Sequence, residues 1–209
     1  MKADYKLLKQ VQTKKGNYIS LFGLSEDLGQ TLVIGVVHGD EPQGKFLIEK
    51  YLDETIKKEV LFLPCLNPDG FDLKTRTNFN GVDINRNFPT QNWELTEKDS
   101  YYGGDEPASE TETRFVIDII KEYQPKSIIT LHTPYKIVNY DGPAKELAEK
   151  ISDIIKYPVE ASIGYPTPGS FGTYAGVERN IPVITLEMDE EISVEVLYKD
   201  IKEIFNRAI

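Results

Sequence analysis

The chain has only two histidines, and each of them comes directly after an apolar run. His38 follows the run 31–37, and Glu41 stands three residues further on. His132 ends the segment SIITLH, much later in the chain. Two histidines and one glutamate are a known ligand set of catalytic zinc sites, which leave a fourth position open for water. A His and a Glu at this spacing are common by chance, but the joint placement of the three residues favours a metal site.

These residues lie at the ends of segments that we expect to be buried strands. Short, β-branched and almost wholly apolar runs are typical of strands that are covered on both faces. Such runs end at His38, at the turn signal NPDG (67–70), at His132 and at Glu187. Helical spacing of apolar residues predicts helices over residues 41–58, 109–123, 143–156 and 193–208. Ser109 is the expected N-cap of the second of these helices.

Strands that alternate with helices predict an α/β layered sandwich around a mixed or mostly parallel sheet. In such sheets the active site lies beyond the carboxyl ends of the strands, so the four strand ends could converge there. Residues 71–104 are polar and rich in Asn and Gly, and residues 163–176 are rich in Gly and Pro. We expect both segments to be loops, and long loops in compact domains are usually functional.

Length, charge and cysteine content narrow the class of protein. A chain of 209 residues suits a single domain over residues 1–209. A net charge of −10 argues against a nucleic-acid partner or an anionic membrane surface. No apolar run is long enough to span a bilayer, and the N-terminus lacks the apolar core of a signal peptide. Cys65 is the only cysteine, which excludes an internal disulfide and favours the cytoplasm.

Five motifs occur in an order that resembles a known family. HGDE, NPDG, GVDINRNFP, LHTP and ITLEM are similar to the motifs of zinc carboxypeptidases of the carboxypeptidase A type. The resemblance runs from about Thr31 to Met188. It implies a three-layer α/β sandwich with a central mixed, mostly parallel sheet, and a hydrolase that cuts an amide bond next to a free carboxylate.

The resemblance also implies roles for the residues at the strand ends. One zinc ion per chain would be held by His38, Glu41 and His132. Glu187 would be the general base that takes a proton from the water that zinc activates. Zinc lowers the pKa of a coordinated water to about 7, and a nearby carboxylate can then work as base and later as acid.

Three further residues take roles from the same resemblance. Asn85 and Arg86 would bind the free carboxylate of the substrate, because a guanidinium grips a carboxylate with two parallel hydrogen bonds. Arg76 is the only arginine between NPDG and DINRNF. It would polarise the scissile carbonyl and stabilise the charge that develops on its oxygen. Asp83 is kept as a structural residue, because the family does not use that position as a ligand.

Two segments are similar to one branch of the family. IGYPTPGSFGTYAG and RTNFNGVDINRNFP resemble the bacterial murein peptide amidases. That resemblance implies a small peptide substrate, cut between γ-D-glutamate and meso-diaminopimelate. Tyr165 and Tyr174 lie near the position of a substrate-covering tyrosine, but loop packing is the role we expect for both. Thr133, after the second histidine, keeps a hydroxyl that could contact substrate.

Two other functions remain open at this point. Aspartoacylases and succinylglutamate desuccinylases share the H-x-x-E pair, an N-R-x-F segment and a later histidine, and they remove acyl groups from amino acids. A catalytically silent binding module would keep the fold, yet it is expected to lose a ligand or the base, and all four residues are in place. The sequence leaves open the released amino acid, the number of chains in an assembly, and whether cobalt or nickel replaces zinc.

Overall fold

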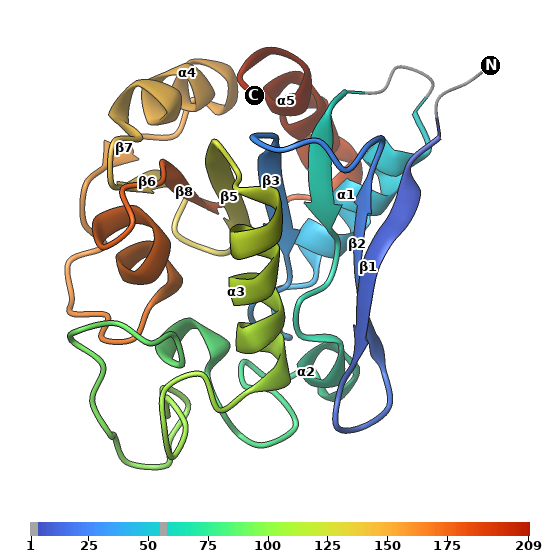
Figure 1. Cartoon of the computed structure of the whole chain (residues 1–209). Coiled ribbons are helices and arrows are strands. Elements are labelled where there is room, and N and C mark those ends of the chain that lie inside the picture. Colours follow the sequence, from blue (N-terminus) through green and yellow to red (C-terminus); the bar gives the residue numbers. More distant parts are fainter. Residues whose placement is uncertain (1–3, 55–57) are drawn as a thin grey trace.

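The computed structural model describes residues 4–54 and 58–209, and within them one sheet of eight strands forms the centre of the molecule (Figure 1). The strands are β1 (Lys6–Gln12), β2 (Tyr18–Gly23), β3 (Thr31–Gly35), β4 (Val60–Leu63), β5 (Ser127–His132), β6 (Ile137–Asp141), β7 (Val159–Glu160) and β8 (Val183–Glu187). Their order in space is β1-β2-β4-β3-β5-β8-β6-β7. The four strands in the middle, β4, β3, β5 and β8, run parallel, while β2 and β6 join them antiparallel on either side.

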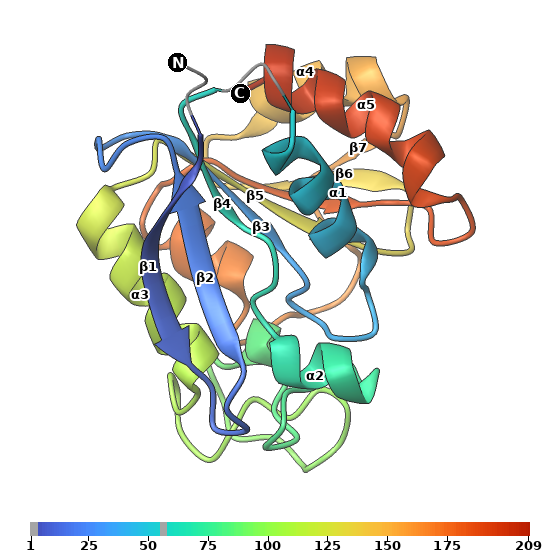
Figure 2. The same cartoon turned by 90° about the vertical axis from the view of Figure 1, so that its right-hand side faces the viewer.

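Helices cover both faces of this sheet (Figure 2). One face carries α3 (Thr111–Tyr123) and a π-helical turn, η2 (Gly172–Val177). The other carries α1 (Gln43–Leu52), α4 (Lys145–Ile155) and α5 (Val194–Arg207). Each face has its own apolar core, so the structure is a three-layer sandwich with a mixed, mostly parallel sheet. The expected fold class is confirmed.

The central strands form because their side chains are apolar on both faces. Every residue of β3 and β4 is buried, and so is every residue of β5. A strand between two helical layers has no solvated face and therefore no need for alternating polar residues. The regular strands end earlier than predicted, since β3 stops at Gly35 and β4 at Leu63. Residues 36–38 thus leave the sheet before the first histidine is reached.

The start of α3 differs from the prediction. The helix begins at Thr111 with Glu110 at the N-cap, so the assignment of Ser109 as the cap was wrong. The hydroxyl of Ser109 donates instead to Glu110 Oε1 at 2.6 Å and accepts from the side-chain amide of Asn87 at 2.9 Å. A hydroxyl that is already used in this way does not cap the helix.

The NPDG segment forms more than the predicted turn. Asn67 Oδ1 accepts a hydrogen bond from Gly70 N at 2.9 Å and caps a short helix, α2 (Pro68–Leu73), with proline in its first turn. The predicted loop over residues 71–104 therefore begins inside α2. It also contains a 3₁₀ turn, η1 (Ile84–Arg86), which carries the NR pair of the DINRNF motif.

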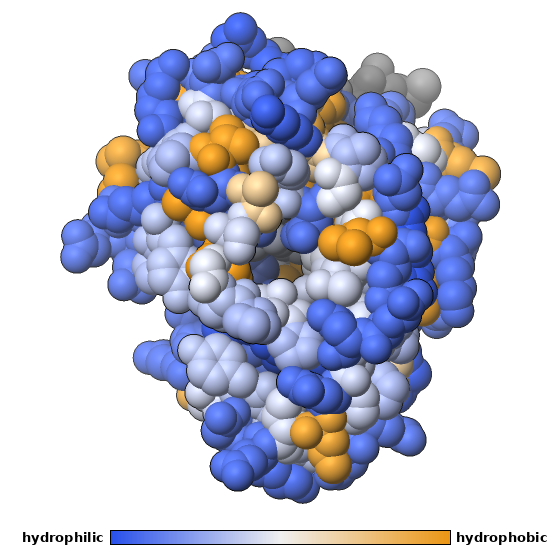
Figure 3. Space-filling view, turned by 90° about the vertical axis from the view of Figure 1, so that its left-hand side faces the viewer, coloured by the Kyte–Doolittle hydropathy of each residue, from blue (hydrophilic) through white to orange (hydrophobic). Residues whose placement is uncertain are grey.

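Among the described residues, no helix has both the length and the apolar character that crossing a membrane requires. The face of the molecule on the side of β6 and β7 is hollowed near its middle, and hydrophilic residues make up most of the surface of that face (Figure 3). The carboxyl ends of the parallel strands and the loops after them face the cavity described next.

Candidate active site and metal centre

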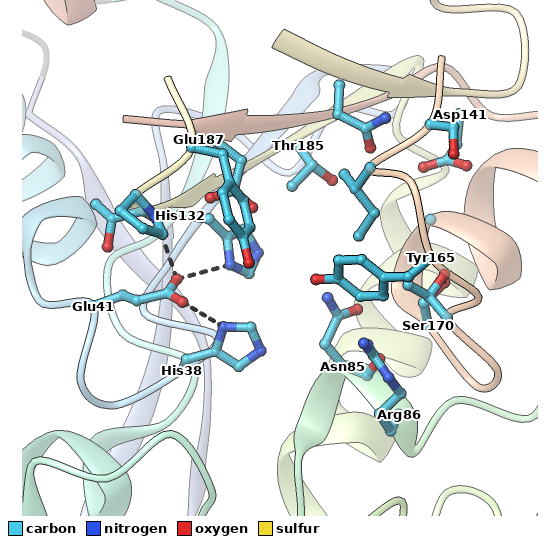
Figure 4. A pocket seen from close by; sticks show the side chains of 18 of the residues that line it. His38, Glu41, Asn85, Arg86, His132, Asp141, Tyr165, Ser170, Thr185 and Glu187 are labelled. Atoms are coloured by element: carbon cyan, nitrogen blue, oxygen red, sulfur yellow. Dashed lines mark hydrogen bonds and ion pairs between the residues drawn. The ribbon is translucent and has the colours of Figure 1, made fainter. Parts of the chain in front are cut away.

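Strand register brings the residues predicted for the metal site together. In the β3–β5 pair Gly35 lies opposite Leu131, and in the β5–β8 pair His132 lies opposite Glu187. His38 follows the end of β3 by three residues and reaches the same edge of the sheet. Figure 4 shows these two histidines, Glu41 and Glu187 grouped on one side of the cavity. Segments that are far apart in the chain therefore converge as the sequence predicted.

The three predicted ligands have the spacing that a metal ion requires. Nδ1 of His38 lies 2.8 Å from Glu41 Oε1, and Nδ1 of His132 lies 2.9 Å from Glu41 Oε2. One ligand atom from each residue falls within 4.8 Å of the others, and all three residues are buried. Zinc bonds of about 2.0–2.1 Å in a tetrahedron place ligands a little over 3 Å apart. Two imidazoles and one carboxylate at these distances fit a zinc ion.

Asp83 orients the first histidine from behind. Its side chain is fully buried, and Oδ1 lies 3.3 Å from His38 Nε2, while Nδ1 of the same ring faces Glu41. A carboxylate behind a ligating imidazole fixes the ring and leaves the other nitrogen for the metal. Burial lowers the pKa of His38, but the charges of Glu41 and Asp83 outweigh it and raise the pKa to about 9. Asp83 is structural, as expected, yet it belongs to the site.

The segment that carries His38 is held in a strained shape. Val36 is fully buried and has φ = +53°, a left-handed conformation that a β-branched residue rarely adopts. Its carbonyl accepts from Asn67 N at 2.9 Å, which ties the segment to the start of α2. Gly39 lies against α2 as well, because a Cβ built there would be 2.0 Å from the carbonyl carbon of Gly70. Two close contacts with α2 thus direct His38 into the cavity.

Glu187 has the surroundings of a general base. It is 7% exposed, and its Oε2 atom is buried without a hydrogen-bond partner among the described atoms. Burial raises the pKa of this carboxyl, and the neighbouring charge of His132 works in the opposite direction. A partly desolvated carboxylate with a free oxygen that points into a cavity can exchange a proton with a bound water.

Arg76 is fixed beside the metal ligands. Its Nε and Nη2 atoms donate to Asp83 Oδ2 at 3.0 and 2.8 Å, and Nη1 lies 3.3 Å from His38 Nδ1. Burial favours the neutral form, but the adjacent carboxylate of Asp83 raises the pKa of Arg76. The guanidinium therefore stays charged at the cavity wall, where it can face a carbonyl oxygen.

Asn85 and Arg86 line the same cavity on the side opposite the histidines (Figure 4). Asn85 Oδ1 accepts from Phe171 N at 2.9 Å, so its amide nitrogen remains available as a donor. Arg86 is buried, and its Nη1 donates to the carbonyl of Asn85 at 2.8 Å. Two donors side by side can receive a carboxylate.

A carboxylate closes the far wall of the cavity, and the sequence reasoning missed it. Asp141 ends β6, whose antiparallel register places Ile137 beside Glu187 and Asp141 beside Val183. Four residues of strand correspond to about 13 Å, so the cavity runs down the β6–β8 pair. Only glycine at 172 leaves room for this side chain, because a Cβ there would lie 2.1 Å from Asp141 Oδ2.

Asp141 has no ion-pair partner within residues 4–54 and 58–209, and burial raises the pKa of its carboxyl. The cavity, about 210 Å³ in volume, is thus lined by the guanidinium groups of Arg76 and Arg86 and, away from the metal ligands and Glu187, by the carboxylate of Asp141. A molecule that carries both a carboxylate and a separate cationic group matches this distribution of charge.

The two tyrosines differ in place. Tyr165 lines the cavity, and its ring lies near Asn85 with the hydroxyl directed toward the histidines (Figure 4). Its side chain is therefore not confined to the packing within the loop that we expected. Tyr174 is 3% exposed and packs against Phe88 at 5.4 Å between ring centroids, which confirms a packing role. Thr133 lines the cavity and offers its backbone N–H to Glu41 Oε2 at 3.4 Å.

Comparison with known proteins agrees with this arrangement. The family model for zinc carboxypeptidases matches residues 31–156. Murein peptide amidase A of Escherichia coli K12 is 34% identical over 171 residues, which cover 75% of this chain and 69% of that protein. The Vibrio campbellii protein of the same name is 34% identical over 182 residues, with 78% and 71% covered.

A solved structure extends the match to nearly the whole chain. The crystal structure of murein-tripeptide amidase from Escherichia coli O157 has a TM-score of 0.82 and 28% sequence identity. The match covers 98% of this chain and 91% of that one. The chain belongs to the zinc carboxypeptidase family and is a hydrolytic metalloenzyme.

Proposed function

We propose that the protein cuts the amide bond between γ-D-glutamate and meso-diaminopimelate in small murein peptides. It would do so as one catalytic domain over residues 1–209 with one zinc ion, in the cytoplasm, where recycled cell-wall peptides are found. Sequence identity of 34% to murein peptide amidases supports the substrate class. The single cysteine, which is a free thiol, supports a reducing compartment.

The charge distribution of the cavity is the observation that carries this proposal. Diaminopimelate has a carboxylate next to the scissile bond, and the far end of its side chain carries an ammonium together with a second carboxylate. Arg86 and Asn85 match the carboxylate, while Asp141, deeper along the β6–β8 pair, matches the ammonium. Asp141 is partly buried, and a partly desolvated carboxylate without an ion-pair partner costs free energy that a cationic substrate group would recover.

The protein groups divide the work of hydrolysis. Zn²⁺ held by His38, Glu41 and His132 would supply Lewis-acid activation of water and of the scissile carbonyl. Glu187 takes a proton from the attacking water and then delivers it to the leaving amine, so that water adds across the amide bond.

Arginine and asparagine side chains hold the substrate in place for that step. Arg76, already fixed by Asp83, donates to the carbonyl oxygen as negative charge grows on it. Arg86 and Asn85 hold the terminal carboxylate and so align the amide with Glu187.

The test is hydrolysis of L-Ala-γ-D-Glu-meso-diaminopimelate by the zinc-loaded protein. The analogue with L-lysine in the last position, an ordinary C-terminal dipeptide and N-acetyl-aspartate run in parallel, and released amines are separated chromatographically. We expect release of diaminopimelate at a rate at least tenfold above that of the dipeptide. Equal rates on all peptides, or cleavage of N-acetyl-aspartate alone, would refute the proposal.

The other two functions are less well supported. Cleavage of N-acetyl-aspartate would move the chain to the deacylases, but the family match is to carboxypeptidases. A silent binding module is at odds with membership of a family of hydrolytic enzymes and with the assembly of His38, Glu41, His132 and Glu187 in one cavity.

A further inference from the structure

One tyrosine that belongs to none of the recognised motifs lies against both arginines of the cavity. The ring centroid of Tyr101 is 5.0 Å from Arg76 Cζ and 5.7 Å from Arg86 Cζ. Tyr101 lines the cavity and is 49% exposed, so its side chain meets solvent as well as the two guanidinium groups. Cations within about 6 Å of an aromatic ring are attracted to its face.

The two arginines depend on this ring to different degrees. Arg76 donates twice to Asp83 and is fixed without it. The guanidinium of Arg86 interacts with the charge of Asp83 but forms no ion pair in the described part of the chain, and its hydrogen bond goes to the carbonyl of Asn85, its neighbour in sequence. Because Arg86 is 7% exposed, the groups around it restrict its stem, but one local hydrogen bond does not by itself fix the orientation of its guanidinium. Tyr101 is placed to do so.

We propose that Tyr101 is a positioning residue that holds the guanidinium of Arg86 in the orientation that receives the terminal carboxylate of the substrate. Both guanidinium groups are positively charged, and their attraction to the same ring opposes their mutual repulsion. The inference rests on the proposed function, in which Arg86 binds that carboxylate. It assigns a role in ground-state binding, not in the chemical step.

Substitution of an exposed ring tests this role without disturbing the core. In the zinc-loaded enzyme Tyr101→Leu is expected to raise KM for the tripeptide about three- to thirty-fold and to leave kcat within about twofold. Tyr101→Phe keeps the aromatic face and should retain KM within about twofold. Tyr18→Leu removes a tyrosine that is 58% exposed on β2 and is the matched control, expected to change neither constant.

A double-mutant cycle separates action through Arg86 from a direct contact with substrate. In an Arg86→Gln background, Tyr101→Leu should have no further effect on KM. If Tyr101→Leu raised KM in the Arg86→Gln background by as much as it does alone, the proposal would be overturned. An unchanged KM in Tyr101→Leu alone would also overturn it. Equal losses in Tyr101→Phe and Tyr101→Leu would also overturn it, because they would point to the hydroxyl.

A binding measurement keeps this inference distinct from the proposed function. Calorimetric titration of the zinc-loaded protein with free meso-diaminopimelate reports the carboxylate site without turnover. Weaker binding to Tyr101→Leu than to the unmodified protein, by a factor similar to the change in KM, supports the positioning role. Equal affinities refute it. If the unmodified protein neither binds diaminopimelate nor cleaves the tripeptide, the proposed function fails instead.

Discussion

Replacement of Glu112 with glutamine is expected to make the protein more stable at neutral pH and to change its stability little near pH 4.5. Glu112 is 3% exposed in the first turn of α3. Burial raises the pKa of its carboxyl to about 7, and the nearby charge of Glu110 adds to that effect. The side-chain amide of Asn78 donates to Glu110 at 2.7 Å and to Glu112 at 3.3 Å, so the hydrogen bond to Glu112 is the weaker of the two.

The sign and size of the effect follow from proton binding. Between pH 4.5 and about 7 the folded protein keeps a proton on Glu112 that the unfolded chain has already lost. Stability from this group is therefore complete below pH 4.5 and falls as the pH rises through about 7. The loss is about 1.4 kcal/mol per pH unit, or about 3 kcal/mol in all. Glutamine resembles the protonated acid and does not titrate, so Glu112→Gln escapes this loss.

Urea unfolding at several values between pH 4.5 and 8 measures the effect. The quantity to follow is the difference in unfolding free energy between Glu112→Gln and the unmodified protein, because contributions that both proteins share cancel. The difference should grow from near zero to about 3 kcal/mol in favour of the variant. Glu190→Gln, at an exposed position, controls for the loss of one negative charge. A difference that stays constant with pH, or that favours the unmodified protein at pH 8, would refute the reasoning.

Three other outcomes follow from the site. Glu187→Gln should retain zinc, measured by atomic emission, while its turnover falls about 10²- to 10⁴-fold. His132→Ala should lose zinc in the same measurement. Full activity of Glu187→Gln would show that Glu187 is not the general base. Asp141→Asn should lower kcat/KM about ten- to hundredfold for substrates with a terminal ammonium, and it should leave kcat/KM for alanine-ended peptides unchanged. Competition between the two kinds of substrate measures this ratio directly. Gly39→Ala should reduce the unfolding free energy by about 1–3 kcal/mol, since its Cβ would clash with the backbone of Gly70; an unchanged urea midpoint would contradict this.

The two histidines were predictable because each lies at or just after the end of a strand whose apolar composition is easily recognised in the sequence. β3 and β5 are buried throughout and mostly apolar, so the points where they end, near His38 and His132, can be read from composition. Parallel strands put such points at one edge of the sheet. Asn85, Arg86 and Arg76 could be assigned only by resemblance, since polar loop residues carry no periodic signal.

Edge strands and their residues could not be predicted in the same way. β1 and β6 are only partly buried and contain polar residues, so neither has the continuous apolar run of a central strand. Without β6, nothing in the sequence placed Asp141 beside β8. Tyr101 was missed for a related reason: its role depends on two arginines that meet it only in the folded chain.

The antiparallel pairing of β6 with β8 limits how this enzyme's preference can evolve. Side chains on one face of a strand recur at every second residue, about 6.7 Å apart. A carboxylate in this wall can therefore move only in whole steps, from Asp141 to position 139 for example. Asn139→Asp with Asp141→Asn would bring the charge one step nearer to Glu187. If Asp141 binds the cationic end of the substrate, this spacing would favour substrate side chains whose lengths differ in steps of about 6.7 Å.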